Sequence, residues 1–329
     1  MNSQDLDMIR DSAQAAMRDI SPVTALRAIR DGAHDPGFDP AVWRTCGELG
    51  WSGVLVDEPS GGTDMGFAAA AIIARETGRT LCLSPFLSTA LMAAVALRQS
   101  GNAAVNGRWL SRIAAADAIL SPAIDEDRWH DPGRPTATAV NTGDTFRLAG
   151  TKVAVADGHV ADGFIVTASI MGQDGSPVSG LFFVEARTAG LSVTPQRLID
   201  GRLVSTVVFD AAPVPAAYCL ASGAAATHVI QHMLRAGYTG LAARQCGLAE
   251  EALRRTLDYM RQRRQFGQPI GTFQALQHRA ALLHCEIENA WSATLAAAQA
   301  LDAGAADAAL RASVAKAKSA ETSCMVAAE

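Results

Sequence analysis

The sequence predicts an α+β fold in which helices and strands occupy separate stretches of the chain. Alanine-rich segments with helical spacing fill the first third, and helical spacing returns after residue 222. Between them, β-branched runs alternate with turns rich in glycine, aspartate and proline, at intervals of about 8–12 residues. We expect a helical N-terminal domain over residues 1–118, an antiparallel β-domain over residues 119–220 and a C-terminal helical domain over residues 221–329.

Local signals place the first helices. Asp39 followed by Pro40 is typical of a helix start, because Asp caps free N–H groups and Pro fits the first helical position. Residues 60–66 follow a strand-like run at residues 53–56 and distantly resemble a dinucleotide-binding turn. The glycine spacing is wrong and no second strand follows the helix, so we interpret this segment as a loop in which Asp64 caps the next helix.

The middle and last thirds follow different periods. Short strands, forming a sandwich or barrel, are expected at residues 153–155, 164–167, 181–184 and 204–209. Apolar residues at helical spacing then predict two long helices and mark one face of each: Leu253, Leu257 and Met260, then Leu276, Leu283, Ile287 and Trp291. A third helix is expected over residues 305–329.

Composition narrows the class of protein. With 329 residues, 49% of them hydrophobic, the chain can bury a large core. Its net charge of −5 and the lack of a basic stripe argue against a nucleic-acid partner. Six widely spaced cysteines without a Cys-x-x-Cys pair are typical of free thiols in a reducing compartment. The N-terminus does not resemble a signal peptide and no apolar run is long enough for a membrane span, so we expect a cytoplasmic location.

Two weaker patterns do not predict a site. His284 and Glu288 lie four residues apart and share a helix face, but a second pair of ligands is missing, so we expect no metal. Ser313 and Lys316 match a Ser-x-x-Lys pattern whose companion motifs are absent, and we attribute the match to chance.

Residues 261–274, Arg-Gln-Arg-Arg-Gln-Phe-Gly-Gln-Pro-Ile-Gly-Thr-Phe-Gln, are the most informative segment. Clustered arginines precede an aromatic–glycine turn, and Gln274 begins the next helix. Arginine binds phosphate through two parallel hydrogen bonds, and a helix N-terminus offers further N–H donors to an anion. Arginines at a helix end also complement the helix dipole. The residues alone leave a phosphate site and a solvated arginine patch equally open.

Short motifs in all three expected domains carry a resemblance to a known family. They lie at residues 38–43, 49–51, 61–62, 76–79, 84–85, 148–152 and 213–215, and at residues 263–274. Together they resemble the acyl-CoA dehydrogenase family over the whole chain, and the last segment is similar to the family's most specific motif.

The resemblance implies an oxidoreductase that uses FAD to remove two hydrogens from an acyl-CoA thioester. A carboxylate of the enzyme takes the α-proton, and the flavin accepts the β-hydrogen as hydride. The resemblance also implies that Arg263 pairs with the FAD pyrophosphate, that Phe266 packs against the cofactor and that Gln274 hydrogen-bonds to it. In the family these residues reach the flavin of the neighbouring subunit, and electron-transferring flavoprotein accepts the electrons.

The chain departs from the family pattern where its own flavin ring would bind. The family carries a Thr-Glu-Pro…Gly-Ser-Asp segment at the start of the β-domain, but this chain has Ser121-Pro122 and an acidic stretch. Ala154 and Ala156 replace an aromatic and a hydroxyl residue, so aromatic contact with the ring is missing.

The catalytic base is also missing. Gly237 stands at one family position for the catalytic glutamate, and the other position lies beyond Glu329, so no catalytic residue is assigned.

The lost groups would hold the chain's own flavin, whereas the retained groups reach a neighbour's flavin. We therefore expect one subunit of a heterotetrameric acyl-CoA dehydrogenase that shares FAD with a second, catalytic chain in fatty acid or steroid degradation. One alternative is a homomeric enzyme whose base lies in a missing C-terminal segment. Another is a flavin-free assembly subunit, against which the retention of Arg263, Phe266 and Gln274 argues.

Overall fold

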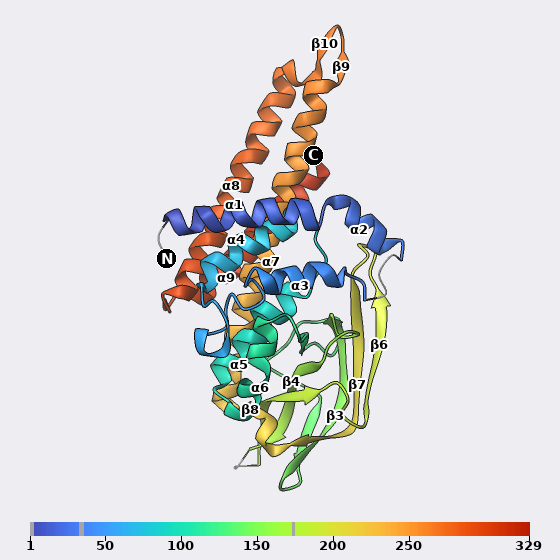
Figure 1. Cartoon of the computed structure of the whole chain (residues 1–329), viewed down its shortest axis with the longest axis vertical. Helices are drawn as coiled ribbons and strands as arrows, with labels where there is room; N and C mark the ends of the chain where they lie inside the picture. Colours follow the sequence, from blue (N-terminus) through green and yellow to red (C-terminus); the bar gives the residue numbers. More distant parts are fainter. Residues whose placement is uncertain (1–2, 33–35, 173–174) are drawn as a thin grey trace. The chain divides into compact units, whose positions relative to one another are not determined.

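A computed structural model describes residues 3–32, 36–172 and 175–329 of the chain (Figure 1). Helices, then strands, then helices follow one another as predicted, so the α+β fold class is confirmed. The chain forms two compact units: unit 1 holds Met1–Leu26, Met65–Cys82 and Tyr238–Glu329, and unit 2 holds Arg27–Asp64 and Leu83–Gly237. Helices α2 (Val23–Arg30) and α7 (Gly223–Gln262) contribute to both units. The domain boundaries expected at residues 118 and 220 stay a prediction.

Unit 1 is built from long helices. Besides its part of α7 it contains α1 (Ser3–Ile20), α4 (Gly66–Arg79), α8 (Gln274–Asp302) and α9 (Ala308–Ala328). Helices α7 and α8 run side by side and are joined at their tip by a small hairpin (Figure 1). The predicted apolar faces meet between these helices, where Leu253, Leu283 and Ile287 form one buried cluster with Ala249 and Val326.

Helices α4 and α7 cross at glycines. A Cβ atom on Gly78 would lie 1.9 Å from the carbonyl oxygen of Arg244, and one on Gly247 would lie 1.9 Å from that of Arg75. No larger residue fits at either position, so the two helices pack backbone against backbone. This crossing brings the arginines of α4 against α7.

A residue far away in the sequence caps the N-terminus of α4. The Asp302 carboxylate accepts hydrogen bonds from the backbone N–H groups of Phe67 (2.6 Å) and Ala68 (3.0 Å). Asp64, which we expected to cap this helix, instead accepts from Arg98 at 2.7 Å. The prediction for Asp64 was therefore wrong, because the cap of α4 comes from the end of α8.

Unit 2 combines helices with a sheet. Its shorter helices are α3 (Pro40–Glu48), η1 (Glu58–Ser60), η2 (Phe86–Ala93), α5 (Ala94–Ser100), α6 (Ala103–Ala114) and η3 (Ala216–Tyr218). Asp39 caps α3 as predicted, since its carboxylate accepts from the Ala41 N–H at 2.9 Å. Residues 53–56, which looked strand-like, form turns.

The described strands of unit 2 make an eight-stranded sheet in the order β6-β7-β3-β2-β4-β5-β8, with β1 also paired to β4. Their bounds are β1 Leu120–Ala123, β2 Thr138–Asn141, β3 Thr145–Ala156, β4 Gly163–Met171, β5 Pro177–Glu185, β6 Leu191–Arg197, β7 Leu203–Pro215 and β8 Cys219–Ser222. Most pairs are antiparallel, as expected. The pairs β1–β4 and β2–β4 are parallel, because long connections, unlike hairpin turns, can return a strand in either direction.

Buried aromatic and β-branched side chains form the core of the sheet, among them Phe164, Phe182, Val207 and Phe209. Among the described residues, none of the helices is long and apolar enough to cross a membrane.

Candidate functional site

The segment between α7 and α8 folds as a tight hairpin. Strand β9 (Arg264–Gln265) pairs antiparallel with β10 (Gln268–Pro269), so Phe266 and Gly267 form a two-residue turn. Both have positive φ, +52° and +79°, as a type I′ turn requires. Glycine adopts this region freely, but a phenylalanine does so at a cost of roughly 1–2 kcal/mol. The strain points to a role for Phe266 outside the packing of the hairpin.

The Phe266 side chain projects into solvent at the tip of the hairpin. It is 92% exposed and meets Phe273 edge-on, with the ring centroids 6.1 Å apart. The ring is therefore available for contact with another molecule.

Arg263 has a fixed backbone and an unpaired side chain. Its N–H donates to the carbonyl oxygen of Tyr259, and its own carbonyl oxygen accepts from the Ile270 N–H, both at 2.8 Å. Within the part of the chain that the structure describes, its guanidinium makes no hydrogen bond or ion pair. Arg261, by contrast, donates to Asp258 at 3.1 Å.

Gln274 begins α8 at the same corner. The residue before it, Phe273, gives the helix no side-chain cap. The backbone N–H groups of Gln274 and Ala275 find no acceptor among the described residues, and the Gln274 side chain is exposed. Uncapped N–H groups at a helix start favour an anion. The structure thus places Arg263, Phe266 and Gln274 on one corner of unit 1, which we call the Arg263 corner.

Two positions in the β-domain, Ala154 and Ala156, carry only small side chains. Ala154 has a φ of +52° at a bulge in β3, where the pairing with β7 shifts between Lys152 and Val155. A bulge commonly re-aims a side chain. Here Ala154 and Ala156 are exposed and offer only methyl groups, so the bulge presents neither a ring nor a hydroxyl.

A buried polar network that the sequence did not suggest lies beside this bulge. The Lys152 ammonium is fully buried and donates to the Ile124 carbonyl oxygen (3.1 Å), the Glu126 carboxylate (2.7 Å) and the Thr167 hydroxyl (2.9 Å). Glu126 also accepts from the Thr136 N–H at 2.6 Å. The Lys152 ammonium and the Glu126 carboxylate are therefore paired within the chain, whereas the buried Ser121 hydroxyl nearby in sequence has no partner among the described residues.

Burial and pairing act on both charges of the network. Burial lowers the pKa of Lys152, and the hydrogen bond to Glu126 offsets only part of that effect. For Glu126, burial acts to raise the pKa, but the hydrogen bonds from Lys152 and Thr136 outweigh it, so the pKa lies below its ordinary value. Glu126 is thus held as a carboxylate for the lysine and is a poor proton acceptor.

Gly237, on α7, leaves no room for a larger side chain without rearrangement. A Cβ atom at this position would lie 2.8 Å from the sulfur of Met92. Met92 therefore occupies the space that a carboxylate side chain would need. Among the described residues, His, Cys, Asp and Glu side chains do not gather in any group of three or more that could hold a metal ion.

Comparisons with known proteins agree on one family. The model of the acyl-CoA dehydrogenase N-terminal domain matches residues 3–117, and the model of the C-terminal domain matches residues 227–329. The acyl-CoA dehydrogenase IpdE2 of Mycobacterium tuberculosis is 30% identical over 323 residues, which is 92% of this chain and 84% of that protein. In the alignment with a second acyl-CoA dehydrogenase of that organism, the chain spans 62% of the relative's length.

Solved structures with the same fold include a steroid ACAD and a complex of two named proteins. A variant of the Tcur3481-Tcur3483 steroid ACAD gives a TM-score of 0.86 at 32% identity, covering 98% of this chain and 84% of that chain. The ChsE4-ChsE5 complex from Mycobacterium tuberculosis gives a TM-score of 0.83 at 26% identity, covering 99% of this chain and 87% of that chain.

Proposed function

The chain belongs to the acyl-CoA dehydrogenase family, and we propose that it is the non-catalytic partner in a heteromeric member of that family. In this proposal the complex carries out α,β-dehydrogenation of an acyl-CoA thioester with FAD. This chain contributes the Arg263 corner to an FAD whose ring is seated in a second acyl-CoA dehydrogenase chain. That second chain also supplies the catalytic glutamate.

The Arg263 corner fits the diphosphate part of FAD. An unpaired guanidinium and unused N–H groups at the start of α8 are the donors that a diphosphate needs. We assign Arg263 to the diphosphate, Gln274 to a hydrogen bond with the cofactor and the exposed Phe266 ring to packing against it. When bound, FAD would supply the two-electron oxidation that no side chain of this chain provides.

The chain's own β-domain does not fit the flavin ring. Ala154 and Ala156 offer no aromatic face and no hydroxyl, and the Lys152 network engages the Glu126 carboxylate and the Thr167 hydroxyl. Met92 occupies the space beside Gly237, where the family has a base. The contrast between the unpaired Arg263 guanidinium and the bare methyl groups of Ala154 and Ala156 is the observation that carries the proposal.

The structural neighbours support a two-chain assembly. The ChsE4-ChsE5 structure is named as a complex, and the steroid ACAD also carries two chain names. By analogy we propose a heterotetramer that acts in fatty acid or steroid degradation, with electron-transferring flavoprotein as its acceptor and the cytoplasm as its location.

Two alternatives make different demands on the residues. A homomeric enzyme would need this chain's β-domain to hold the ring, for which Ala154 and Ala156 are poor groups. A flavin-free assembly subunit would have no use for the strained, exposed Phe266 or for the unpaired Arg263.

Purification of the chain alone tests the proposal. We expect a colourless protein without acyl-CoA dehydrogenase activity, because Ala154 and Ala156 offer the flavin ring no aromatic or hydroxyl contact and Gly237 carries no carboxylate. Flavin absorbance and dye reduction with acyl-CoA substrates give the readouts. A yellow, active homo-oligomer would overturn the proposal in favour of the homomeric alternative.

A further inference from the structure

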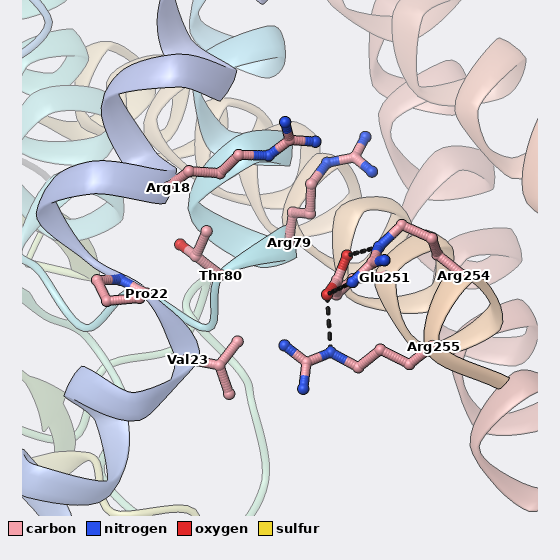
Figure 2. Close-up of a pocket in the computed structure, with 8 residues that line it drawn as sticks. All are labelled: Arg18, Pro22, Val23, Arg79, Thr80, Glu251, Arg254 and Arg255. Atoms are coloured by element: carbon pink, nitrogen blue, oxygen red, sulfur yellow. Dashed lines mark hydrogen bonds and ion pairs between the residues drawn. The ribbon is translucent and has the colours of Figure 1, made fainter. Parts of the chain in front are cut away.

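A second cluster of arginines surrounds a cavity of about 440 Å³ in unit 1 (Figure 2). It is lined by Arg18 from α1, Arg79 at the end of α4, and Arg254 and Arg255 from α7, and we call it the arginine pocket. The ion pairs around it do not use all of the donors that these arginines carry.

Arg79 is the buried member of the set. It is only 8% exposed, and it donates through Nε to Glu76 (2.9 Å) and through Nη2 to Glu250 (2.6 Å). Its Nη1 has no partner among the described residues. Two carboxylates and the surrounding helices therefore fix the guanidinium, and one edge of it is left over for a ligand.

Glu251 is shared by two arginines. It accepts from Nε and Nη2 of Arg254 and from Nε of Arg255, each at 2.7 Å. Both terminal nitrogens of Arg255 are unpartnered within the described part of the chain. In Figure 2 the Arg255 guanidinium points toward Val23, away from the backbone of α7.

Arg18 contributes a whole guanidinium without a partner. None of its nitrogens makes a hydrogen bond or ion pair with any described residue. Arg18 and Arg79 line the same cavity (Figure 2). Like charges around one cavity repel one another, and an anion bound between them would relieve that repulsion.

Helix dipoles explain only part of this arrangement. Arg18 and Arg79 stand in the last turns of α1 and α4, where a cation is favourable without any ligand. Arg255 lies two turns before the end of α7, so that argument does not apply to it. Unused donors from three separate helices line the same cavity, together with apolar surface from Pro22 and Val23.

We propose that the arginine pocket binds a phosphate ester of nucleotide size, with its phosphates on Arg18, Arg79 and Arg255. A bare phosphate would leave most of the cavity empty, whereas the base or sugar of a nucleotide could pack on Pro22 and Val23. The site is separate from the Arg263 corner: Arg255 precedes Arg263 by eight residues, or roughly 12 Å along a helix. The inference therefore goes beyond the proposed function.

Calorimetric titration of the full chain with ADP and with inorganic pyrophosphate tests the proposal. Four proteins are compared: wild type, the double variant R18Q/R255Q, R263Q, and R261Q as a matched loss of one surface arginine. Arg18 and Arg255 are exposed, so their replacement should leave the melting temperature unchanged, unlike a change at buried Arg79.

We expect ADP to bind the wild type more tightly than pyrophosphate does, and R18Q/R255Q to weaken ADP binding on the order of a hundredfold. R261Q should change it less than threefold, and R263Q distinguishes ADP bound at the Arg263 corner from ADP bound in the arginine pocket. Three results would overturn the proposal: no ADP binding to the wild type, equal binding by wild type and R18Q/R255Q, or a loss that follows R263Q instead. If pyrophosphate binds as tightly as ADP, Pro22 and Val23 do not contribute to binding by packing against the base or sugar.

Discussion

The ring of Phe266 stands edge-on to that of Phe273 across the turn that separates Arg263 from Gln274. This contact holds a strained, solvent-exposed aromatic at the point where α7 and α8 are joined. The hairpin thus presents the Phe266 side chain to solvent at the corner that also carries Arg263 and Gln274.

A substitution that relieves the backbone strain at Phe266 should raise the stability of the chain and weaken cofactor binding. Asparagine tolerates positive φ, so F266N should raise the free energy of unfolding by about 0.5–1 kcal/mol, even though it loses the exposed ring contact with Phe273. Flavin retention in the assembled complex should fall at the same time. Urea unfolding of the full chain measures the first effect, and a drop in stability for F266N would contradict it.

The Asp302 cap of α4 should contribute measurably to the free energy of unfolding. D302A removes the acceptor for the Phe67 and Ala68 N–H groups and should cost about 1–2 kcal/mol of unfolding free energy. D64N serves as the control, since Asp64 is a surface partner of Arg98 and should cost under about 1 kcal/mol. Equal effects of the two changes would argue that Asp302 does not act as the cap.

The Glu126 carboxylate should make stability depend on pH in the acid range. Its folded-state pKa lies below the usual 4.5, so its stabilising contribution is present above pH 4.5 and is lost as pH falls through the folded-state pKa. E126Q should lower stability at neutral pH, because it leaves Lys152 buried without its counter-charge, and should flatten the loss on acidification.

Melting temperatures of wild type and E126Q between about pH 6 and about pH 3 give the comparison. D200N removes an exposed carboxylate that is paired with Arg202. The slope of its melting temperature against pH should equal that of the wild type. A slope for E126Q as steep as that of the wild type would show that Glu126 is not the group responsible.

Met92 should limit any attempt to place a base at position 237. G237E must displace the flexible end of the Met92 side chain and should cost about 1 kcal/mol. M92A creates the space, so G237E/M92A should be more stable than the sum of the two single effects predicts. Unfolding free energies are measured for the wild type, G237E, M92A and G237E/M92A. If the two single changes add up to the double change, the steric account is wrong.

Local signals in the sequence were enough for most of the fold. Asp39 and Pro40 start α3, because capping and proline geometry act within a few residues. The Asp302 cap was out of reach, since 235 residues separate Asp302 from Phe67. The parallel pairing of β1 with β4 depends on how the chain returns, which periodicity does not encode.

Some features of the candidate site could also be predicted from the sequence, and others could not. The hairpin that brings Arg263 near Gln274 follows from the turn at Phe266 and Gly267 and from Pro269, and these residues can be read from the sequence. The burial of Lys152 was not visible, because the sequence gives a lysine no sign that it lies inside a sheet rather than on its surface. The arginine pocket was also missed, since its four arginines come from three helices that are distant in sequence.

The most direct test of the central claim is the flavin content of a complex in which only this chain's Arg263 is changed. The chain is co-expressed with a second acyl-CoA dehydrogenase chain that keeps the ring-binding segment and the catalytic glutamate. R263Q should weaken FAD retention by roughly tenfold or more, whereas R261Q, whose arginine is paired with Asp258, should change it little. FAD bound to the R263Q complex as tightly as to the wild type would contradict the claim that this chain supplies half of its partner's cofactor site.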